Sequence, residues 1–335
     1  MRVGFETALQ VYERLPEDRR SPYFHPYYVT SDAVRDASLE PVFFVYRKAG
    51  EVYYHAFHLG RVAGTSMSDI QSPYAYGGPL SSTHDPGFLF EAWRQYKDWC
   101  RENSVLAEFI RFHPLIANWS FFPGEVRFMR ETVWIDLEPN QPGLTYSPRV
   151  RTAIRKAISN HLEVRWVADV GSYGGFAALY NDFMKQLGAD EFYRFPAGYF
   201  QKLREWQSSY LAIAFKDGKN LGTALFLRES NIMEYHLAVS NSDGKKWNAS
   251  NLILDQAVHL AKELGCRVLH LGGGTDNRPE NSLLFFKSGF SPRRASFQIG
   301  KMIHAPERYE AMQREWQDKH GEHPEKVLFY RFTGP

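Results

Sequence analysis

Apolar residues gather along the chain in two similar series. Segments 41–54 and 211–227 each contain two apolar runs separated by a short polar turn, and each predicts a β-hairpin. The second turn contains Asp217-Gly218, a strong turn pair because glycine adopts positive φ without steric cost. Both halves of the chain are therefore expected to contain the same strand–turn–strand unit.

Each hairpin is followed by a helix and then by a short strand. Apolar residues at helical spacing predict helices over 87–102 and 250–264, and we expect Ser250 to cap the second. Strands are predicted at 105–111 and 267–271. The two series are offset by roughly 165 residues, longer than any solenoid repeat, and indicate a duplicated α+β domain.

A junction between the two halves is expected near Leu144, because residues 139–148 are rich in turn formers. Ser147 and Pro148 then predict the N-cap and first residue of a helix. We expect this helix to bury an apolar face and to expose basic residues; the two sets are Val150, Ala153, Ile154, Ala157 and Ile158, and Arg149, Arg151, Arg155 and Lys156.

Composition excludes several classes of protein. The 335 residues contain 40 basic and 38 acidic side chains, for a net charge of +2, and 44% hydrophobic residues. These values exclude disordered, collagen-like and disulfide-scaffold chains, and the near-neutral charge argues against a dedicated DNA-binding protein. Cys100 and Cys266 are far apart, so no zinc site is expected. With no signal-like start and no long apolar run, we expect a cytoplasmic protein without a transmembrane segment.

Common catalytic motifs are missing from the sequence. The absence of GxxxxGK[ST], GxGxxG and GxSxG removes the basis for P-loop, dinucleotide-binding and α/β-hydrolase interpretations. His55 and His58 fall on opposite faces of a predicted strand and do not suggest a shared metal, and His270 is expected in the core. Residues 272–274 are three glycines, which form a tight turn or let a ligand approach the backbone. A short helix ending in Lys287 follows them.

Several segments together resemble the FemAB-like branch of the GNAT acyltransferase superfamily. They occur in the family's order and span most of the chain: 72–79 (SPYAYGGP), 112–114 (FHP), 151–157 (RTAIRKA), 192–196 with 199–200, 235–238 (YHLA), and 271–274 leading to Phe286-Lys287. The resemblance implies an α+β fold with two tandem GNAT-like domains and a cleft between them. It implies a first domain at 1–145, joined by a returning segment 318–335, and a second domain at 146–317 that carries the site.

The resemblance also implies roles for individual residues. The backbone of Phe286 would help to hold a developing oxyanion, and Lys287 would stabilise negative charge at the reacting ester. Arg194 would grip a phosphate of the acceptor, or else form a plain surface ion pair. Further substrate-binding positions are Tyr235, Gly273, Gly274 and Asp276. The basic residues Arg151, Arg155 and Lys156 would contact phosphates of a tRNA donor, or form a solvated helix face. Neither a metal nor a permanently bound cofactor is implied.

The implied activity is transfer of an acyl or aminoacyl group to an amine of a cell-envelope precursor, a peptidoglycan peptide or an amino sugar. The precursor would be a nucleotide-sugar or lipid-linked, with visits to the inner membrane face in the latter case. The general base is left open among Asp276, Glu280 and the substrate itself.

The donor is also left open between aminoacyl-tRNA and acyl-CoA. Residues 241–250 lack the Q/RxxGxG/A loop that cradles the pyrophosphate of CoA, which favours tRNA. The interval 145–175 holds one short predicted helix instead of a coiled-coil arm, which favours CoA or another small donor. The alternatives are an acyl-CoA-dependent N-acetyltransferase of exopolysaccharide or small-molecule biosynthesis, a non-catalytic module that binds a nucleotide-sugar or glycan, and an RNA-binding protein.

Overall fold

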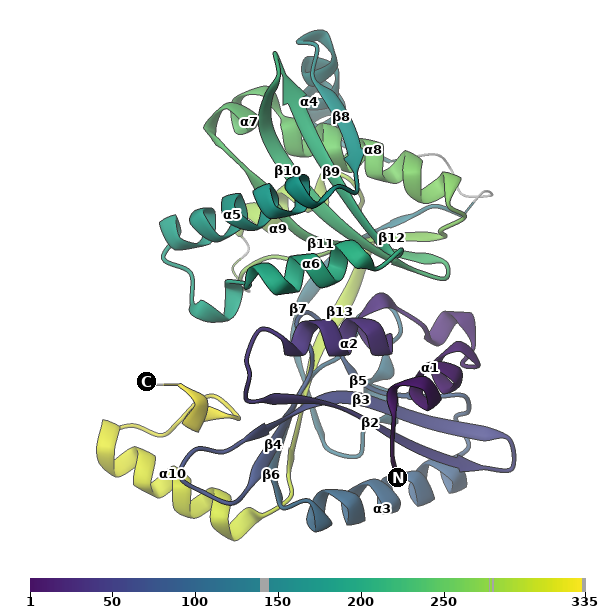
Figure 1. Ribbon diagram of the computed structural model, residues 1–335, viewed down its shortest axis with the longest axis vertical. Coiled ribbons are helices and arrows are strands. Elements are labelled where there is room, and N and C mark those ends of the chain that lie inside the picture. Colours follow the sequence, from purple (N-terminus) through teal and green to yellow (C-terminus); the bar gives the residue numbers. More distant parts are fainter. Residues whose placement is uncertain (139–144, 277, 279, 333–335) are drawn as a thin grey trace. The chain divides into compact units, whose positions relative to one another are not determined.

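The computed structural model describes residues 1–138, 145–276, 278 and 280–332, and Figure 1 shows its helices and strands. The chain divides into two compact units, Met1–Met129 with Phe297–Pro335, and Arg130–Ser296. The expected domain limits at residues 145 and 317 stay predictions, since a compact unit is not by itself an independently folding domain. The expected junction at 139–144 lies outside the described residues.

The first unit is built from the following elements. Its helices are α1 (Phe5–Glu13), α2 (Pro26–Ala33), α3 (Pro86–Glu102) and α10 (Pro306–His320), with 3-10 turns at Glu17–Arg19, Pro22–Phe24, Asn118–Phe121 and Phe329–Arg331. Its strands are β1 (Arg2–Val3), β2 (Leu39–Lys48), β3 (Glu51–Arg61), β4 (Ser68–Gln71), β5 (Gly78–Ser81) and β6 (Val105–Arg111). Two further strands have residues in both units, β7 (Glu125–Asp136) and β13 (Arg294–Ile303).

Alternation along β2 explains how the first sheet buries both of its faces. The strands follow the order β1-β2-β3-β4-β6-β13, with β5 paired to β3. Phe43 and Val45 belong to a core that also contains residues of α1 and α2, whereas Val42 and Phe44 belong to a core that contains residues of α3. Successive side chains of a strand point to opposite faces, so one apolar run serves two helix layers.

The C-terminal segment is bound to the first unit by a buried ion pair. Arg331 donates from Nε and Nη2 to the two carboxylate oxygens of Asp69, at 2.6 and 2.7 Å. Asp69 is fully buried on β4, and Gly60 leaves the space that the Arg331 guanidinium occupies. A paired, bidentate arrangement is the form in which a carboxylate tolerates burial.

The second unit contains a separate set of elements. Its helices are α4 (Pro148–Ser159), α5 (Val170–Gln186), α6 (Ala197–Glu205), α7 (Ser242–Trp247), α8 (Ala249–Glu263) and α9 (Ser282–Ser288), with a 3-10 turn at Glu191–Tyr193. Its strands are β8 (Glu163–Val167), β9 (Ser209–Lys216), β10 (Lys219–Glu229), β11 (Ile232–Ser240) and β12 (Val268–Gly273).

The sheet of the second unit has the order β7-β12-β11-β10-β9-β8. Ala212 and Ala214 of β9 lie in a core shared with α4 and α8. On α5 and α6, aromatic side chains pack edge to face, as between Phe176 and Phe200 at 5.4 Å, and Tyr173 of α5 contacts Ser209 of β9. Figure 1 shows α5 and α6 lying along this sheet.

The α+β class and the repeated order of elements are confirmed. Both predicted hairpins are present, and the turn at Asp217 and Gly218 has positive φ at both residues, +50° and +74°. Ser147 caps α4 by accepting a hydrogen bond from the Val150 amide, as predicted. Among the described residues, no helix is long and apolar enough to cross a membrane.

Three expectations about local structure are wrong. The N-cap of α8 is Asn248, at φ +61°, and Ser250 lies inside the helix. Ile158 is 56% exposed, because it lies past the edge of the face that α4 buries. The interval 145–175 contains β8 and the start of α5 in addition to the short helix α4.

Candidate functional site

Two neighbouring parallel strands diverge in the second unit. Strands β11 and β12 pair over three residues each, from Ile232 opposite Val268 to Glu234 opposite His270. Beyond Glu234, β11 continues alongside β10 to Ser240, while β12 continues alongside β7. Backbone groups on the facing edges of the diverging strands are therefore not used in a shared ladder.

Irregular backbone marks the divergence on both strands. On β11, Leu225 of β10 pairs with Leu237 and Phe226 pairs with Tyr235, so His236 is an extra, bulged residue. On β12 the register shifts between His270 and Gly272, and Gly272 has φ +73°. Bulges re-aim side chains and are enriched next to active sites. The predicted glycine turn is thus the end of a strand rather than a free loop.

Lys287 is buried at this divergence. It lies on α9 with 7% of its surface exposed, and its Nζ donates a hydrogen bond to the carbonyl of Gly273, at 2.8 Å. The same nitrogen lies 5.9 Å from the centre of the Tyr235 ring. The structure therefore brings together three residues that sequence analysis singled out, one each from α9, β12 and β11.

The environment of Lys287 strongly disfavours its charge. Burial lowers the pKa of the Lys287 amine from 10.5 to about 7. Among the described residues no carboxylate forms a salt bridge with it, so little offsets the cost of removing the ammonium from water. A lysine in this state switches between cation and neutral amine near physiological pH, which is the property a site of proton transfer or charge stabilisation needs.

Asn281 organises the turn between β12 and α9. Its Oδ1 accepts a hydrogen bond from the Leu284 amide and so caps α9, while its Nδ2 donates to Asp276 at 3.0 Å. A Cβ on Gly274 would collide with the Asn281 side chain, so this glycine is required by close packing. Hydrogen bonds from the Arg278 amide and from Asn281 lower the pKa of Asp276, which makes its carboxylate a weaker base.

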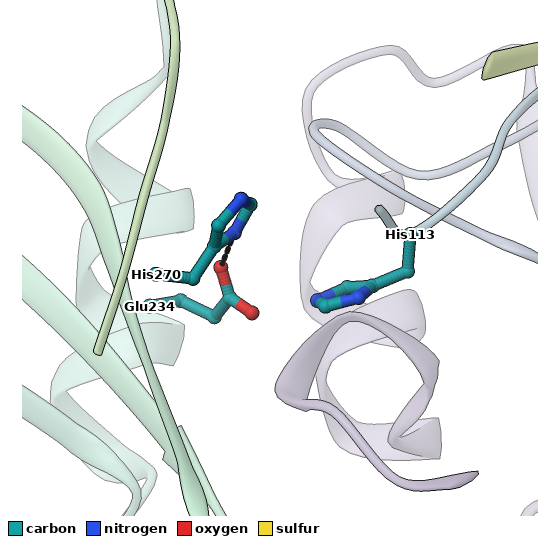
Figure 2. Close-up of side chains that lie close together, drawn as sticks. All are labelled: His113, Glu234 and His270. Carbon is teal, nitrogen blue, oxygen red and sulfur yellow. Dashed lines mark hydrogen bonds and ion pairs between the residues drawn. The ribbon is translucent and has the colours of Figure 1, made fainter. Parts of the chain in front are cut away.

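A buried acid–imidazole pair lies at the root of the divergence, and sequence analysis did not assign it a function. His270 Nδ1 and Glu234 Oε2 are 2.8 Å apart, and the two side chains are 0% and 2% exposed (Figure 2). The two residues face each other because they are register partners on adjacent parallel strands. The sequence feature that could have indicated this pair is a Glu and a His that each interrupt a predicted apolar strand. A hydrogen-bonded carboxylate and imidazole can relay a proton.

His236, the bulged residue of β11, has a tyrosine partner. His236 Nε2 lies 2.6 Å from the hydroxyl of Tyr199 on α6, and both side chains are buried. Both residues fall in segments that carry the family resemblance, but no role was predicted for them. The contact ties the bulge of β11 to the helix layer.

Three other predicted site residues are exposed or half-buried. Arg194 follows the 3-10 turn and forms an exposed ion pair with Glu191, at 2.9 Å. Phe286 is half-buried on α9 and packs against Phe290, with ring centres 5.5 Å apart. Glu280 is exposed. The roles expected for these residues stay predictions.

The basic side of α4 is exposed, as predicted. Arg151 donates to the carbonyl of Tyr146, and Arg155 lies 3.5 Å from the hydroxyl of Thr152. Lys156 is exposed on the same helix. Their contact with phosphates stays a prediction.

Residues 241–250, which lack the motif of a pyrophosphate-binding loop, contain helix α7. Asn241 caps it by accepting a hydrogen bond from the Gly244 amide, and a Cβ on Gly244 would collide with the carbonyl oxygen of Leu221. Lys245 lies over the ring of Phe183, at 5.6 Å. A helical turn therefore occupies the segment where a pyrophosphate-binding loop would stand.

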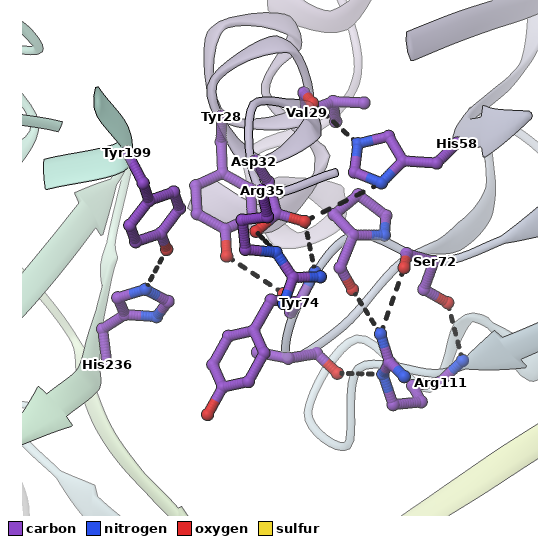
Figure 3. Close-up of polar contacts among 12 residues, drawn as sticks. Tyr28, Val29, Asp32, Arg35, His58, Ser72, Tyr74, Arg111, Tyr199 and His236 are labelled. Atoms are coloured by element: carbon purple, nitrogen blue, oxygen red, sulfur yellow. Dashed lines mark hydrogen bonds and ion pairs between the residues drawn. The ribbon is translucent and has the colours of Figure 1, made fainter. Parts of the chain in front are cut away.

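Residues 72–77, the part of the motif that precedes β5, form a loop held by charged side chains of the first unit (Figure 3). The carboxylate of Asp32 accepts the amide of Tyr74 at 2.8 Å and pairs with Arg35 at 2.8 Å. The guanidinium of Arg111 donates to three carbonyls of the loop, at 2.8 to 3.2 Å. The backbone of this loop is therefore held in one conformation by side chains from α2 and β6.

Comparison with solved structures places this geometry in a known fold. FemX matches with a TM-score of 0.69 and 12% identity over 93% of this chain and 99% of its own. L-PGS from Bacillus licheniformis matches with a TM-score of 0.57 and 10% identity, over 88% and 91%. A tandem GNAT protein from the clavulanic acid pathway matches with a TM-score of 0.50 and 12% identity, over 91% and 98%.

The chain has the fold of FemX and of the tandem GNAT protein. No protein-family model and no curated protein matches the sequence. The expected tandem GNAT-like architecture is confirmed, and identities of 10 to 12% limit the likeness to the fold.

Proposed function

We propose that the protein is an N-acyltransferase that moves an aminoacyl group from aminoacyl-tRNA to an amine of a cell-envelope precursor, a peptidoglycan peptide or an amino sugar. The observation that carries the proposal is the buried amine of Lys287 at the divergence of β11 and β12. The FemX-like fold supports it, since the FemAB-like relatives that the sequence resembles perform this class of transfer.

Transfer of the aminoacyl group requires a cation or a hydrogen-bond donor directed at the carbonyl oxygen on which negative charge develops. As the acceptor amine attacks the ester carbonyl, a C–N bond forms, the carbonyl oxygen becomes negative, and the C–O bond to the ribose then breaks. The ribose oxygen gains a proton and the amine loses one, so the step balances without a metal or redox partner. The ammonium form of Lys287 stabilises the oxyanion, and such a preorganised donor is worth about 2.7–4 kcal/mol.

Acyl-CoA is the second candidate donor. The tandem GNAT protein from the clavulanic acid pathway, whose structure is that of the state without AcCoA, shares the fold. Helix α7 argues against acyl-CoA, because two amides of its first turn are already engaged: Gly244 donates to the Asn241 side chain and Lys245 to the Asn241 carbonyl. A pyrophosphate needs free amides at a strand–helix junction.

Transfer of label tests the proposal. Purified protein is incubated with tRNA charged with radiolabelled amino acids and with UDP-linked muropeptide or amino-sugar acceptors, and labelled product is separated by chromatography. We expect transfer that falls about 100- to 1,000-fold in Lys287→Met, in line with the loss of one oxyanion donor. The matched control is Lys262→Met, an exposed lysine of α8. Equal transfer by Lys287→Met and the wild type would refute the assignment of Lys287. Transfer from acetyl-CoA but not from charged tRNA would show that the donor is acyl-CoA.

A further inference from the structure

The last paired residues before β11 and β12 diverge are a glutamate and a histidine. Glu234 is the register partner of His270, and among the described residues the two strands share no pair beyond them. His270 Nδ1 lies 2.8 Å from Glu234 Oε2, and both side chains are buried. Transfer to an amine needs a group that takes the proton of that amine, and this pair borders the opening between the strands.

The pair points to the face of the sheet opposite Lys287. Tyr235, which follows Glu234, and Leu269, which precedes His270, pack in the core shared with α4 and α8. The Lys287 amine lies 5.9 Å from the centre of the Tyr235 ring. Because successive side chains of a strand alternate, Glu234 and His270 point to the other face, along which α5 and α6 lie in Figure 1.

The hydrogen bond to Glu234 determines which nitrogen of His270 carries the proton. A carboxylate only accepts hydrogen bonds, so Nδ1 is the donor and Nε2 of the neutral ring keeps its lone pair. The same carboxylate stabilises the imidazolium that forms when Nε2 takes up a proton. The imidazole is therefore held in the tautomer of a general base, with its basic nitrogen directed away from Glu234.

We propose that His270 is the general base of the transfer, with Glu234 as its positioning residue. This inference rests on the proposed function. As the neutral acceptor amine attacks the ester, the C–N bond forms and the amine proton moves to His270 Nε2. When the C–O bond breaks, the ribose oxygen takes that proton from Nε2. His270 thus returns to its starting state, and the step needs no further reactant.

The spacing of the base and the oxyanion donor suits a single tetrahedral centre. His270 and Gly273, whose carbonyl accepts the hydrogen bond from Lys287, are three residues apart on β12, roughly 10 Å along the strand. The nitrogen and the oxygen of a tetrahedral intermediate point in different directions. A base on one face of the sheet and a cation on the other therefore approach such an intermediate from different sides.

His270 suits this role better than the two acids that the sequence left open. Hydrogen bonds lower the pKa of Asp276, which makes it a weaker base, and Glu280 is exposed. Water surrounding an exposed carboxylate competes for its hydrogen bonds, whereas a buried imidazole fixed by a carboxylate is pre-oriented.

Transfer kinetics of His270→Asn test the proposal. The amide nitrogen of Asn takes roughly the place of Nδ1 and still donates to Glu234, whereas the basic Nε2 is removed. We expect kcat for transfer from charged tRNA to fall about 100- to 10,000-fold, with little change in KM. Glu234→Gln, which removes the charge that stabilises the imidazolium, is expected to lower kcat in the same direction.

An exposed histidine of the same unit supplies the matched control. His259 of α8 also faces a carboxylate, Asp255, at 3.9 Å, but its side chain is 58% exposed. We expect His259→Asn to transfer as the wild type does. Thermal unfolding shows whether each variant is folded.

The tautomer of His270 gives a readout that does not need turnover. Long-range proton–nitrogen NMR spectra of protein with isotope-labelled histidine show which ring nitrogen is protonated, and the signal that is missing in His270→Asn identifies the residue. We expect the proton on Nδ1 in the wild type. A proton on Nε2 of the neutral ring would overturn the proposal.

The outcomes separate this inference from the proposed function. Wild-type kcat in folded His270→Asn, or in folded Glu234→Gln, overturns the assignment of the pair. If His270→Asn transfers normally while Lys287→Met loses transfer, the proposed function stands and only the assignment of the base fails. No transfer from charged tRNA by the wild type itself would refute the proposed function, and this inference with it.

Discussion

Replacement of Lys287 by Met is expected to stabilise the protein at neutral pH. The pKa of the Lys287 amine is 10.5 when the amine is unperturbed and about 7 in the folded chain. Between these values the unfolded chain holds a proton that the folded chain has released. Stability must therefore rise with pH across this window, and the folded state is most penalised below pH 7.

The size of the effect follows from the two pKa values. The linkage relation gives a penalty of about 4 kcal/mol at pH 7 that falls to about 2 kcal/mol at pH 9. The wild type is thus expected to gain about 2 kcal/mol between these pH values from this residue alone. The Met variant keeps a side chain of similar length without the charge, so it avoids the penalty and lacks the pH dependence.

Urea unfolding followed by tryptophan fluorescence at pH 7 and pH 9 measures this difference. Wild type, Lys287→Met and the exposed-lysine control Lys262→Met are compared at equal m-value, so that a change in midpoint is a change in stability. The reasoning is refuted if Lys287→Met is less stable than the wild type at pH 7, or if it keeps the same pH dependence. Unchanged pH dependence would mean that the amine keeps its charge in the folded protein, and lower stability at pH 7 would mean that the hydrogen bond from Nζ to the Gly273 carbonyl outweighs the cost of burial.

Four further outcomes are expected. Arg331→Met leaves the buried Asp69 carboxylate unpaired and should cost about 3–5 kcal/mol of stability, which chemical denaturation measures; an unchanged midpoint would contradict the role of the ion pair. Gly244→Ala forces a methyl group against the carbonyl oxygen of Leu221 in β10 and should cost about 1–3 kcal/mol of stability; an unaltered unfolding midpoint would contradict the close packing of α7 on β10. Arg194→Ala should change stability by less than about 1 kcal/mol, so calorimetry of acceptor binding isolates its role, and equal affinity would remove it from the acceptor site. Because the protonated form of Lys287 is the active one, kcat should fall as pH rises through about 7, and a rise there would show that the neutral amine acts instead.

Elements with a strong local pattern were predictable from the sequence. The hairpin at 211–227 combines apolar runs with Asp217-Gly218, and the structure forms the turn with positive φ at both residues. The start of α4 follows from Ser147 and Pro148, whose preferences are those of an N-cap and a first helical residue. In these cases short-range energetics and the final fold agree, so local inference is sufficient.

Elements fixed by tertiary contacts were not predictable in the same way. Residues 241–250 are polar and favour a loop, yet Gly244 packs closely against β10 and α7 forms. The bulge at His236 depends on the register between β10 and β11, which no local pattern encodes. The Glu234–His270 pair depends on which strands become neighbours, so it emerges only once the order of the sheet is known.

Lys287 shows how sequence and structure contribute different parts of one conclusion. Its position beside Phe286 was enough to single it out by resemblance, but a lysine near the end of a short helix is ordinarily solvated. Burial comes from the turn after β12, where Asn281 caps α9 and a close-packed Gly274 brings the helix back onto the strand. A buried amine that has no carboxylate partner among the described residues weakens the fold by several kcal/mol, and a chain retains such a feature most readily where the perturbed charge does chemical work. The instability predicted for the wild type at neutral pH and the predicted loss of transfer in Lys287→Met therefore have one origin, the placement of a cation where water cannot hydrate it.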